Sequence, residues 1–102
     1  MKKTLAIVSA LLVIGSLAFA QTTKQPKIGV AIYNFDDTFM SYVRNAIQDN
    51  AKGKATIEMV DSQNAQPTQN DQVDSFLSKK MNAIAINPVD RTAAATIINK
   101  AK

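Results

Sequence analysis

Short apolar runs and amphipathic segments alternate along most of the chain. Apolar runs at 28–33, 55–60 and 83–86 have the length and composition of β-strands. The first and third runs are nearly unbroken, as in strands that are covered on both faces, whereas the second contains Thr56 and Glu58. We therefore expect the second strand to lie nearer an edge of the sheet.

A segment with helical periodicity follows each apolar run. Apolar residues recur at spacings of three and four over 39–51, 69–77 and 94–101, which predicts three helices. The stretch 64–68 is expected to be a loop that leads into the second helix. Asp36, Asp37 or Thr38 could cap the start of the first helix, and Gly53 suits its end. Asp90 could cap the start of the third helix.

Strands that alternate with helices predict an α/β fold with a parallel sheet and right-handed crossovers. Helices on both faces of the sheet would give three layers, in the order βαβαβα. Three strands are few for this architecture. We therefore expect residues 28–102 to be an incomplete portion of a larger lobe.

The first twenty residues have the features of an export signal. Lys2 and Lys3 precede an apolar run over 5–19, and Ala18-Phe19-Ala20 has the small-x-small pattern of a cleavage site. The alternative is an uncleaved membrane anchor, but the run is short for a spanning helix, which needs roughly 20 apolar residues. We predict a signal peptide over 1–20, cleavage after Ala20, a flexible lead-in over 21–27, and a periplasmic product.

Composition narrows the possible chemistry. The chain has no Cys and no His, which excludes disulfides, thiolate chemistry, the usual zinc sites and His-based acid–base catalysis for this chain. The whole chain has 12 basic and 8 acidic residues, and removal of Lys2 and Lys3 lowers the net charge from +4 to +2. This small charge is spread evenly along the sequence and argues against a nucleic-acid or membrane-surface binder.

Candidate chemistry lies where the predicted strands end, because ligands of open parallel sheets bind outside the carboxyl ends of the strands. Three short loops follow the predicted strands, at 34–39, 61–64 and 87–90, and we call them elbows. They are rich in carboxylates and amides and contain no glycine. This composition suits a neutral, hydroxyl-rich ligand better than a phosphate. Asp37 could accept hydrogen bonds from hydroxyls, and Phe39 could offer an aromatic face to a sugar ring.

Each of these residues also has an ordinary structural explanation. Asp36 and Asp37 could simply cap a helix, and Phe39 could belong to the apolar core. Asn before Pro is common where a strand ends, so turn formation explains Asn87 before Pro88 as well as ligand contact does. The sequence pattern leaves both readings open at each position.

Several segments resemble the periplasmic monosaccharide-binding proteins, in particular the branch that binds D-galactose and D-glucose. They are 28–33, 36–41, 61–64, 69–74 and 83–90, and the similarity extends over nearly all of the chain after residue 26. The resemblance implies a two-lobed receptor of the periplasmic-binding-protein type I fold, with 28–102 as part of the N-terminal lobe. It also implies a monosaccharide ligand, a membrane ABC permease as partner and, in many bacteria, a chemoreceptor. We expect a monomer.

The resemblance also implies roles for single residues. Asp37 would accept hydrogen bonds from the sugar, Phe39 would stack on one ring face, and Asp36 would support the elbow. Asn87 matches a position that contacts sugar in the ribose branch. No cofactor is expected in this chain, because the calcium loop of the family would lie beyond residue 102. Three positions depart from the hexose-branch pattern: Phe35, Thr38 and Pro88.

Other functions remain to be compared with this one. Within the class, the ligand could be ribose or another monosaccharide. An enzyme on a flavodoxin-like sheet could use Asp36, Asp37 and Asp61 as acid–base residues, but no nucleophile, metal cluster or glycine-rich loop accompanies them. A sugar-responsive transcription regulator would need a helix-turn-helix where the export signal stands. We therefore predict a binding protein without enzymatic activity.

Overall fold

The computed structural model describes residues 24–102, so the predicted signal peptide and residues 21–23 lie outside the described residues. Three parallel strands form one sheet with the order β2-β1-β3. The strands are β1 (Lys27–Ile32), β2 (Thr56–Asp61) and β3 (Ala83–Ile86). The helices are α1 (Thr38–Ala51), α2 (Gln66–Ser78) and α3 (Ala94–Ala101), the last preceded by a 3₁₀ turn, η1 (Arg91–Ala93).

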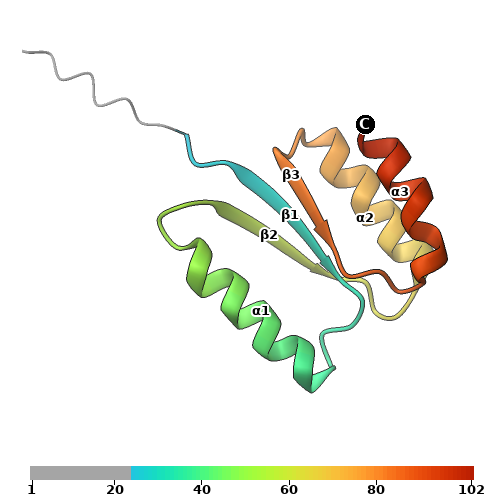
Figure 1. The fold of residues 1–102 in the computed structure, drawn as a ribbon, viewed down its shortest axis with the longest axis horizontal. Helices are drawn as coiled ribbons and strands as arrows, with labels where there is room; N and C mark the ends of the chain where they lie inside the picture. The colour runs from blue at the N-terminus through green and yellow to red at the C-terminus, as the bar shows by residue number, and fades with distance from the viewer. Residues whose placement is uncertain (1–23) are drawn as a thin grey trace, which may run out of the picture.

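The elements form the three layers that the sequence predicted. Helix α1 covers one face of the sheet, and α2 and α3 lie together over the other face (Figure 1). On the α1 side, Met40 packs with Val30 and Ile32 of the central strand. The α/β fold with parallel strands and βαβαβα order is therefore confirmed.

The close approach of α2 to the sheet depends on one glycine. A Cβ atom at Gly29 of β1 would lie 2.6 Å from the ring of Phe76, which is closer than carbon atoms can pack. Phe76 is buried on α2. Gly29 therefore leaves the space that the Phe76 ring occupies against the sheet.

The position of β2 was predicted correctly, whereas the covering of β3 was not. In the described residues β2 pairs only with β1 and lies at a sheet edge, as its polar residues indicated. Strand β3 was expected to be covered on both faces, but Ala83 and Ala85 on one face are exposed. The reason is the position of α1, which packs over β1 and β2 and leaves that face of β3 open (Figure 1).

The predicted caps of α1 are correct, but α2 starts earlier than expected. The Met40 N–H donates to Asp37 Oδ1 (2.9 Å), so Asp37 is the N-cap, and Gly53 follows the helix with a φ of 73°. Helix α2 begins at Gln66, inside the predicted loop, because Pro67 suits a first helical turn. Asp90 caps η1 rather than α3, since the Thr92 N–H donates to its Oδ1 (2.9 Å).

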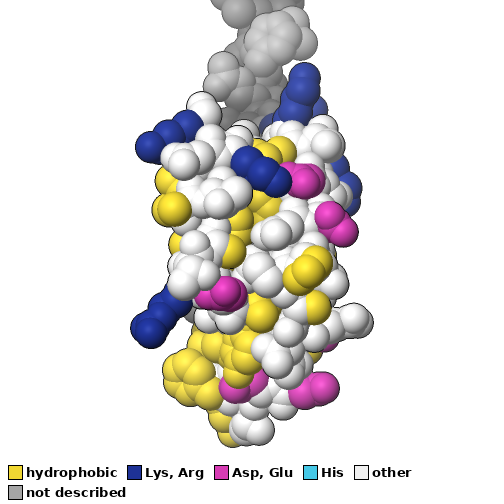
Figure 2. Space-filling view, turned by 90° about the vertical axis from the view of Figure 1, so that its right-hand side faces the viewer, with side chains coloured by type: hydrophobic (Ala, Val, Ile, Leu, Met, Phe, Trp, Pro, Cys, Tyr) yellow, Lys and Arg dark blue, Asp and Glu magenta, His cyan; other side chains and the backbone are white. Residues whose placement is uncertain are grey.

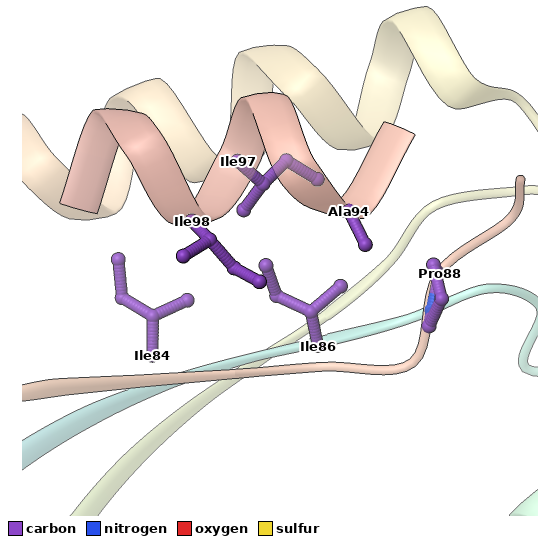
Figure 3. Close-up of a pocket in the computed structure, with 6 residues that line it drawn as sticks. All are labelled: Ile84, Ile86, Pro88, Ala94, Ile97 and Ile98. Carbon is purple, nitrogen blue, oxygen red and sulfur yellow. The ribbon is translucent and has the colours of Figure 1, made fainter. Parts of the chain in front are cut away.

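Two further observations concern the described part of the chain as a whole. Between residues 24 and 102, none of the helices is both long and apolar enough to cross a membrane. A hollow of about 230 Å³ lies between β3 and α3, and its lining is apolar (Figure 3). It is lined by Ile84, Ile86, Pro88, Ala94, Ile97 and Ile98. This hollow lacks the polar side chains that a hydroxyl-rich ligand requires.

Candidate functional site

The parallel sheet brings the three predicted elbows to one edge. The Phe35 N–H after β1 donates to Asp61 Oδ1 at the end of β2 (3.1 Å). The Tyr33 N–H donates to Asn87 Oδ1 after β3 (3.2 Å), and the Asn64 N–H donates to the Tyr33 carbonyl (2.7 Å). All three elbows therefore meet at the carboxyl end of β1.

Asp37 caps α1 and is also held by Tyr33. The Met40 N–H bonds Oδ1, and the Tyr33 hydroxyl donates to Oδ2. The Tyr33 hydroxyl is the main cause that lowers the pKa of Asp37, with the Met40 N–H second, and the same bond raises the pKa of Tyr33. The capping interpretation is thus correct. It does not exclude ligand contact, because each carboxylate oxygen has two acceptor positions.

Asp36 is exposed and takes no part in capping. Its backbone N–H donates to Asn34 Oδ1 (2.9 Å), which tightens the elbow just before α1. Within residues 24–102 its carboxylate has no hydrogen-bond partner. The structure therefore places Asp36 beside Asp37 at the start of α1 and leaves its carboxylate in solvent.

Phe39 does not belong to the core. Its side chain is 71% exposed, whereas its neighbour Met40 is 7% exposed. Phe39 lines an open hollow of about 330 Å³ between α1 and the strands β1 and β3, and Asn87 lines the same hollow. The other lining residues are apolar: Val30, Ile32, Met40, Val43, Ile47, Ala85 and Ile86. The structure thus brings together an exposed aromatic ring and an amide that are 48 positions apart in the sequence.

Asn87 is held in place through its backbone and one side-chain atom. Its N–H donates to the Ala31 carbonyl (2.9 Å), its carbonyl accepts from Gln69 Nε2 (2.9 Å), and its Oδ1 accepts from the Tyr33 N–H. Turn chemistry therefore explains its position. Its Nδ2 donates to no acceptor within the described residues, so this donor is available to a ligand.

Sequence reasoning missed two residues that organise this edge. Tyr33 contacts all three elbows, although the sequence placed it at the end of a strand with no role. Gln69 is fully buried and bonds the Asn87 carbonyl, whereas the sequence pattern placed it in a helix and gave it no role. The recurrence of Gln at 66, 69 and 72 could have indicated the second, because residues three apart share one side of a helix.

The lysines of the described residues gather at one end of the strands, where three of them pair with acidic side chains. These lysines precede or begin strands, or lie in the last turn of a helix or after it, and these positions are all at the amino end of the sheet. They are Lys24, Lys27, Lys52, Lys54, Lys79, Lys80, Lys100 and Lys102. Figure 2 shows most of the dark blue side chains toward that end. The candidate site lies at the opposite end with Asp36, Asp37, Asp61 and Asp90.

The acidic residues at this edge do not form a metal centre. Residues 24–102 contain no group of three or more Asp and Glu side chains close enough to hold a metal ion. Asp37, Asn87 and Phe39 give this edge hydrogen-bond acceptors, an amide donor and an exposed aromatic face.

Comparison with known proteins identifies the family. Residues 28–102 match the model of the periplasmic binding protein domain. The D-galactose/methyl-galactoside binding periplasmic protein of Haemophilus influenzae is 52% identical over 106 residues, covering all of this chain and 32% of that protein. A putative rhizopine-binding protein of Rhizobium meliloti is 31% identical over 102 residues, covering 98% of this chain and 31% of that protein. The chain thus spans about a third of the length of these relatives.

A solved structure agrees with this assignment. An ABC transporter solute binding protein from Bacillus halodurans C-125, crystallised with myo-inositol, superimposes with a TM-score of 0.66 and 38% sequence identity. The match covers 74% of this chain and 27% of that protein. The fold, the family model and the curated relatives agree, and the chain belongs to the periplasmic binding protein domain family.

Proposed function

We propose that this chain is part of a periplasmic sugar-binding protein that delivers its ligand to a membrane ABC permease. The proposed ligand is D-galactose or D-glucose. The observation that carries the proposal is that Phe39 and Asn87 line one hollow, and that Tyr33 bonds both Asp37 and Asn87 beside it, in a member of this family. The 52% identity to a D-galactose/methyl-galactoside binding protein supports the choice of sugar.

The three residues supply complementary chemistry. The free acceptor positions of Asp37 suit sugar hydroxyls, and charge-assisted hydrogen bonds are the stronger kind. The exposed ring of Phe39 can cover the C–H side of a pyranose ring. The Nδ2 of Asn87 can donate to a hydroxyl or to the ring oxygen. We propose Asp36 as a support of the elbow, and we propose no catalytic step at this edge.

The proposed setting rests on the predicted export signal and on the family. Cleavage after Ala20 would release a periplasmic monomer whose second lobe closes over the sugar and supplies further polar partners. The permease is the proposed membrane partner, and a chemoreceptor is a second one. A sugar alcohol is the alternative ligand, because the Bacillus halodurans protein was crystallised with myo-inositol.

The proposal is tested by calorimetric titration of the full-length protein with D-galactose, D-glucose, ribose and myo-inositol. We expect D-galactose or D-glucose to bind most tightly. Phe39→Ala should weaken binding by up to about tenfold, since a lost stacking contact is worth up to about 1.4 kcal/mol. Tyr42→Ala is the matched control, because Tyr42 is equally exposed on α1 but does not line the hollow.

Each result has a clear meaning. Tightest binding of myo-inositol would replace the proposed hexose with a cyclic polyol at the same site. Equal losses in the Phe39 and Tyr42 variants would show that the ring contact at this hollow is not specific. Absence of binding to all four compounds would overturn the proposal.

A further inference from the structure

The buried amide of Gln69 connects two of the three elbows. Its Nε2 donates to the Asn87 carbonyl (2.9 Å) and to Ser62 Oγ (3.1 Å). Its Oε1 accepts from the Val89 N–H (3.1 Å) and from Gln66 Nε2 (3.3 Å). The side chain is 0% exposed, and both donors and both acceptor positions of its amide are used.

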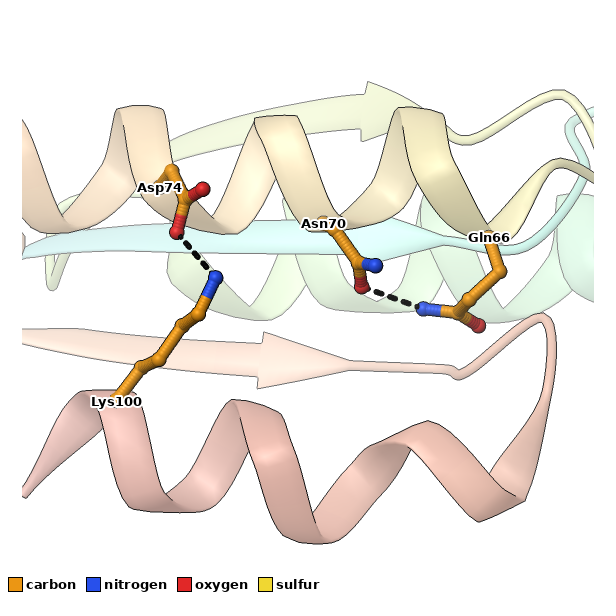
Figure 4. A network of polar contacts seen from close by, with 4 residues as sticks. All are labelled: Gln66, Asn70, Asp74 and Lys100. Atoms are coloured by element: carbon orange, nitrogen blue, oxygen red, sulfur yellow. Dashed lines mark hydrogen bonds and ion pairs between the residues drawn. The ribbon is translucent and has the colours of Figure 1, made fainter.

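Gln69 is the middle member of a row of three glutamines on one side of α2. Gln66 Oε1 accepts from the Asp90 N–H (2.7 Å), and Gln66 Nε2 donates to Asn70 Oδ1 (3.0 Å; Figure 4). Gln72 Nε2 donates to the Asp61 carbonyl (2.8 Å), and Gln72 Oε1 accepts from Ser62 Oγ (2.8 Å). The row therefore holds the elbow after β2 through Gln72 and the elbow after β3 through Gln66 and Gln69.

The elbow after β3 depends on Gln69 because of Pro88. Proline has no N–H, so the backbone polar groups next to it are the Asn87 carbonyl and the Val89 N–H. Gln69 bonds both of them and so clamps the chain on each side of the proline. Loss of this amide would leave two partly buried backbone groups without partners, and the elbow would move to find water.

We propose that Gln69 is a positioning residue that fixes the Asn87 amide for contact with the sugar. The inference rests on the proposed function. The N–H of Asn87 is held by Ala31, its Oδ1 by Tyr33 and its carbonyl by Gln69, so only Nδ2 is left to point outward. The contacts with Ala31 and Tyr33 are made by their backbone groups, so among the three partners only the Gln69 group can be removed by a side-chain substitution.

The test is a double-mutant cycle in the full-length protein, with D-galactose affinity measured for wild type, Asn87→Ala, Gln69→Met and the double variant. Met keeps the length and volume of Gln but has no amide. We expect each single variant to lose about 3- to 10-fold in affinity, the worth of one neutral hydrogen bond. The double variant should lose no more than Asn87→Ala alone, because a misplaced amide and a missing one are equivalent.

Gln72→Met is the matched control, since Gln72 holds its elbow by two similar bonds but does not contact Asn87. It should lower the melting temperature and change the affinity less than twofold. Equal affinity losses at Gln69 and Gln72, or losses that multiply in the double variant, would overturn the inference. If Gln69→Met does not fold, Gln69→Ala replaces it, because the space left by the shorter side chain lets water reach the Asn87 carbonyl and the Val89 N–H.

A measurement without ligand separates this inference from the proposed function. The Asn87 side-chain amide gives a pair of ¹⁵N–¹H NMR signals, and Gln69→Met should shift and broaden them, whereas Gln72→Met should not. Unchanged Asn87 signals in Gln69→Met would overturn the positioning role whichever sugar the protein binds. Failure of wild type to bind any sugar, with shifted signals, would overturn the proposed function alone.

Discussion

At the scale of single residues, Asp37 is where the fold and the candidate site coincide. One of its oxygens caps α1 and the other accepts from Tyr33, whose N–H reaches Asn87. When one residue both caps a helix and faces a ligand, the two roles can be told apart only by a variant that keeps one role and removes the other. Asn is such a variant, because it caps helices about as well as Asp but carries no charge.

The bond between Tyr33 and Asp37 predicts how stability depends on pH. The folded pKa of Asp37 is lowered, so its stabilising contribution is complete above its ordinary pKa of about 3.9 and is lost as the pH falls through the folded value. The pKa of Tyr33 is raised, so its contribution is complete below about 10 and is lost as the pH rises through the folded value.

We therefore expect Tyr33→Phe to flatten both limbs of a plot of melting temperature against pH, the acid limb below about pH 4 and the alkaline limb above about pH 10. Asp37→Asn should flatten the acid limb and also the alkaline one, since Tyr33 loses its carboxylate neighbour. Tyr42→Phe is the control, and it should leave both limbs as in wild type. Parallel curves for Tyr33→Phe and Tyr42→Phe would show that the Tyr33–Asp37 bond does not stabilise the fold.

Truncation of two neighbouring residues on α1 should change the free energy of unfolding by very different amounts. Met40 is buried against Val30 and Ile32, so Met40→Ala should lower the free energy of unfolding by about 2–5 kcal/mol. Phe39 is exposed, so Phe39→Ala should change it by less than about 0.5 kcal/mol. Urea unfolding monitored by circular dichroism measures both values. A large loss in the Phe39 variant would mean that its ring supports the fold and not only a ligand.

At the scale of elements, the contact between β1 and α2 is set by the absence of a side chain at Gly29. Gly29→Ala would place a methyl group 2.6 Å from the Phe76 ring, so the helix must move or the ring must leave its rotamer. We expect a loss of about 1–3 kcal/mol in the free energy of unfolding. Gly29→Ala combined with Phe76→Leu should destabilise by less than the sum of the single changes, because the smaller side chain relieves the clash. Additive losses would show that the destabilisation by Gly29→Ala does not come from a clash with the Phe76 ring.

The elements themselves could be predicted from local patterns, and the exceptions have local causes. The apolar runs gave the strands to within one residue, and Asp37 and Gly53 gave the ends of α1. The start of α2 was placed three residues late, because polar residues with Pro67 look like a loop although proline suits a first helical turn. Periodicity also could not separate Phe39 from Met40, since adjacent positions at the edge of an apolar stripe differ only in how the helix is rotated on the sheet.

The candidate site was predictable in its location but not in its internal bonds. The rule that ligands bind at the carboxyl ends of parallel strands selected three elbows, and these elbows meet in the structure. The contacts of Tyr33 and Gln69 join residues up to 54 positions apart in the sequence, and such pairs follow from strand order and register, which the sequence pattern leaves undetermined. Gln69 was missed for a second reason, because a polar residue within a helix is expected at the surface and not in the core.

At the scale of the whole molecule, the candidate site of the described chain is shallow and one-sided. The hollow beside Phe39 and Asn87 is open, and one face of β3 next to it is exposed. Sugar sites need many polar partners and exclusion of water, whereas the contacts proposed for the described residues are one carboxylate, one amide donor and one ring face. The relatives are about three times as long as this chain, and in the proposed function their remaining residues supply the opposite wall.

This one-sided geometry leads to a prediction for residues 21–102 studied as a separate polypeptide. One charge-assisted hydrogen bond of about 1.5–3 kcal/mol, one neutral hydrogen bond of about 0.5–1.5 kcal/mol and one stacking contact of about 0.5–1.5 kcal/mol do not reach the roughly 4.1 kcal/mol that a dissociation constant of 1 mM requires, once the lost freedom of the ligand is counted. Titration of the ¹⁵N-labelled segment with D-galactose should therefore show a dissociation constant above about 1 mM, whereas the full-length protein should bind far more tightly under the same conditions. A thermal melt of the segment must accompany the titration, because the open face of β3 could prevent folding. A folded segment with millimolar or tighter affinity would mean that this edge holds the sugar without a second wall, and closure of two lobes would then no longer be needed to explain binding.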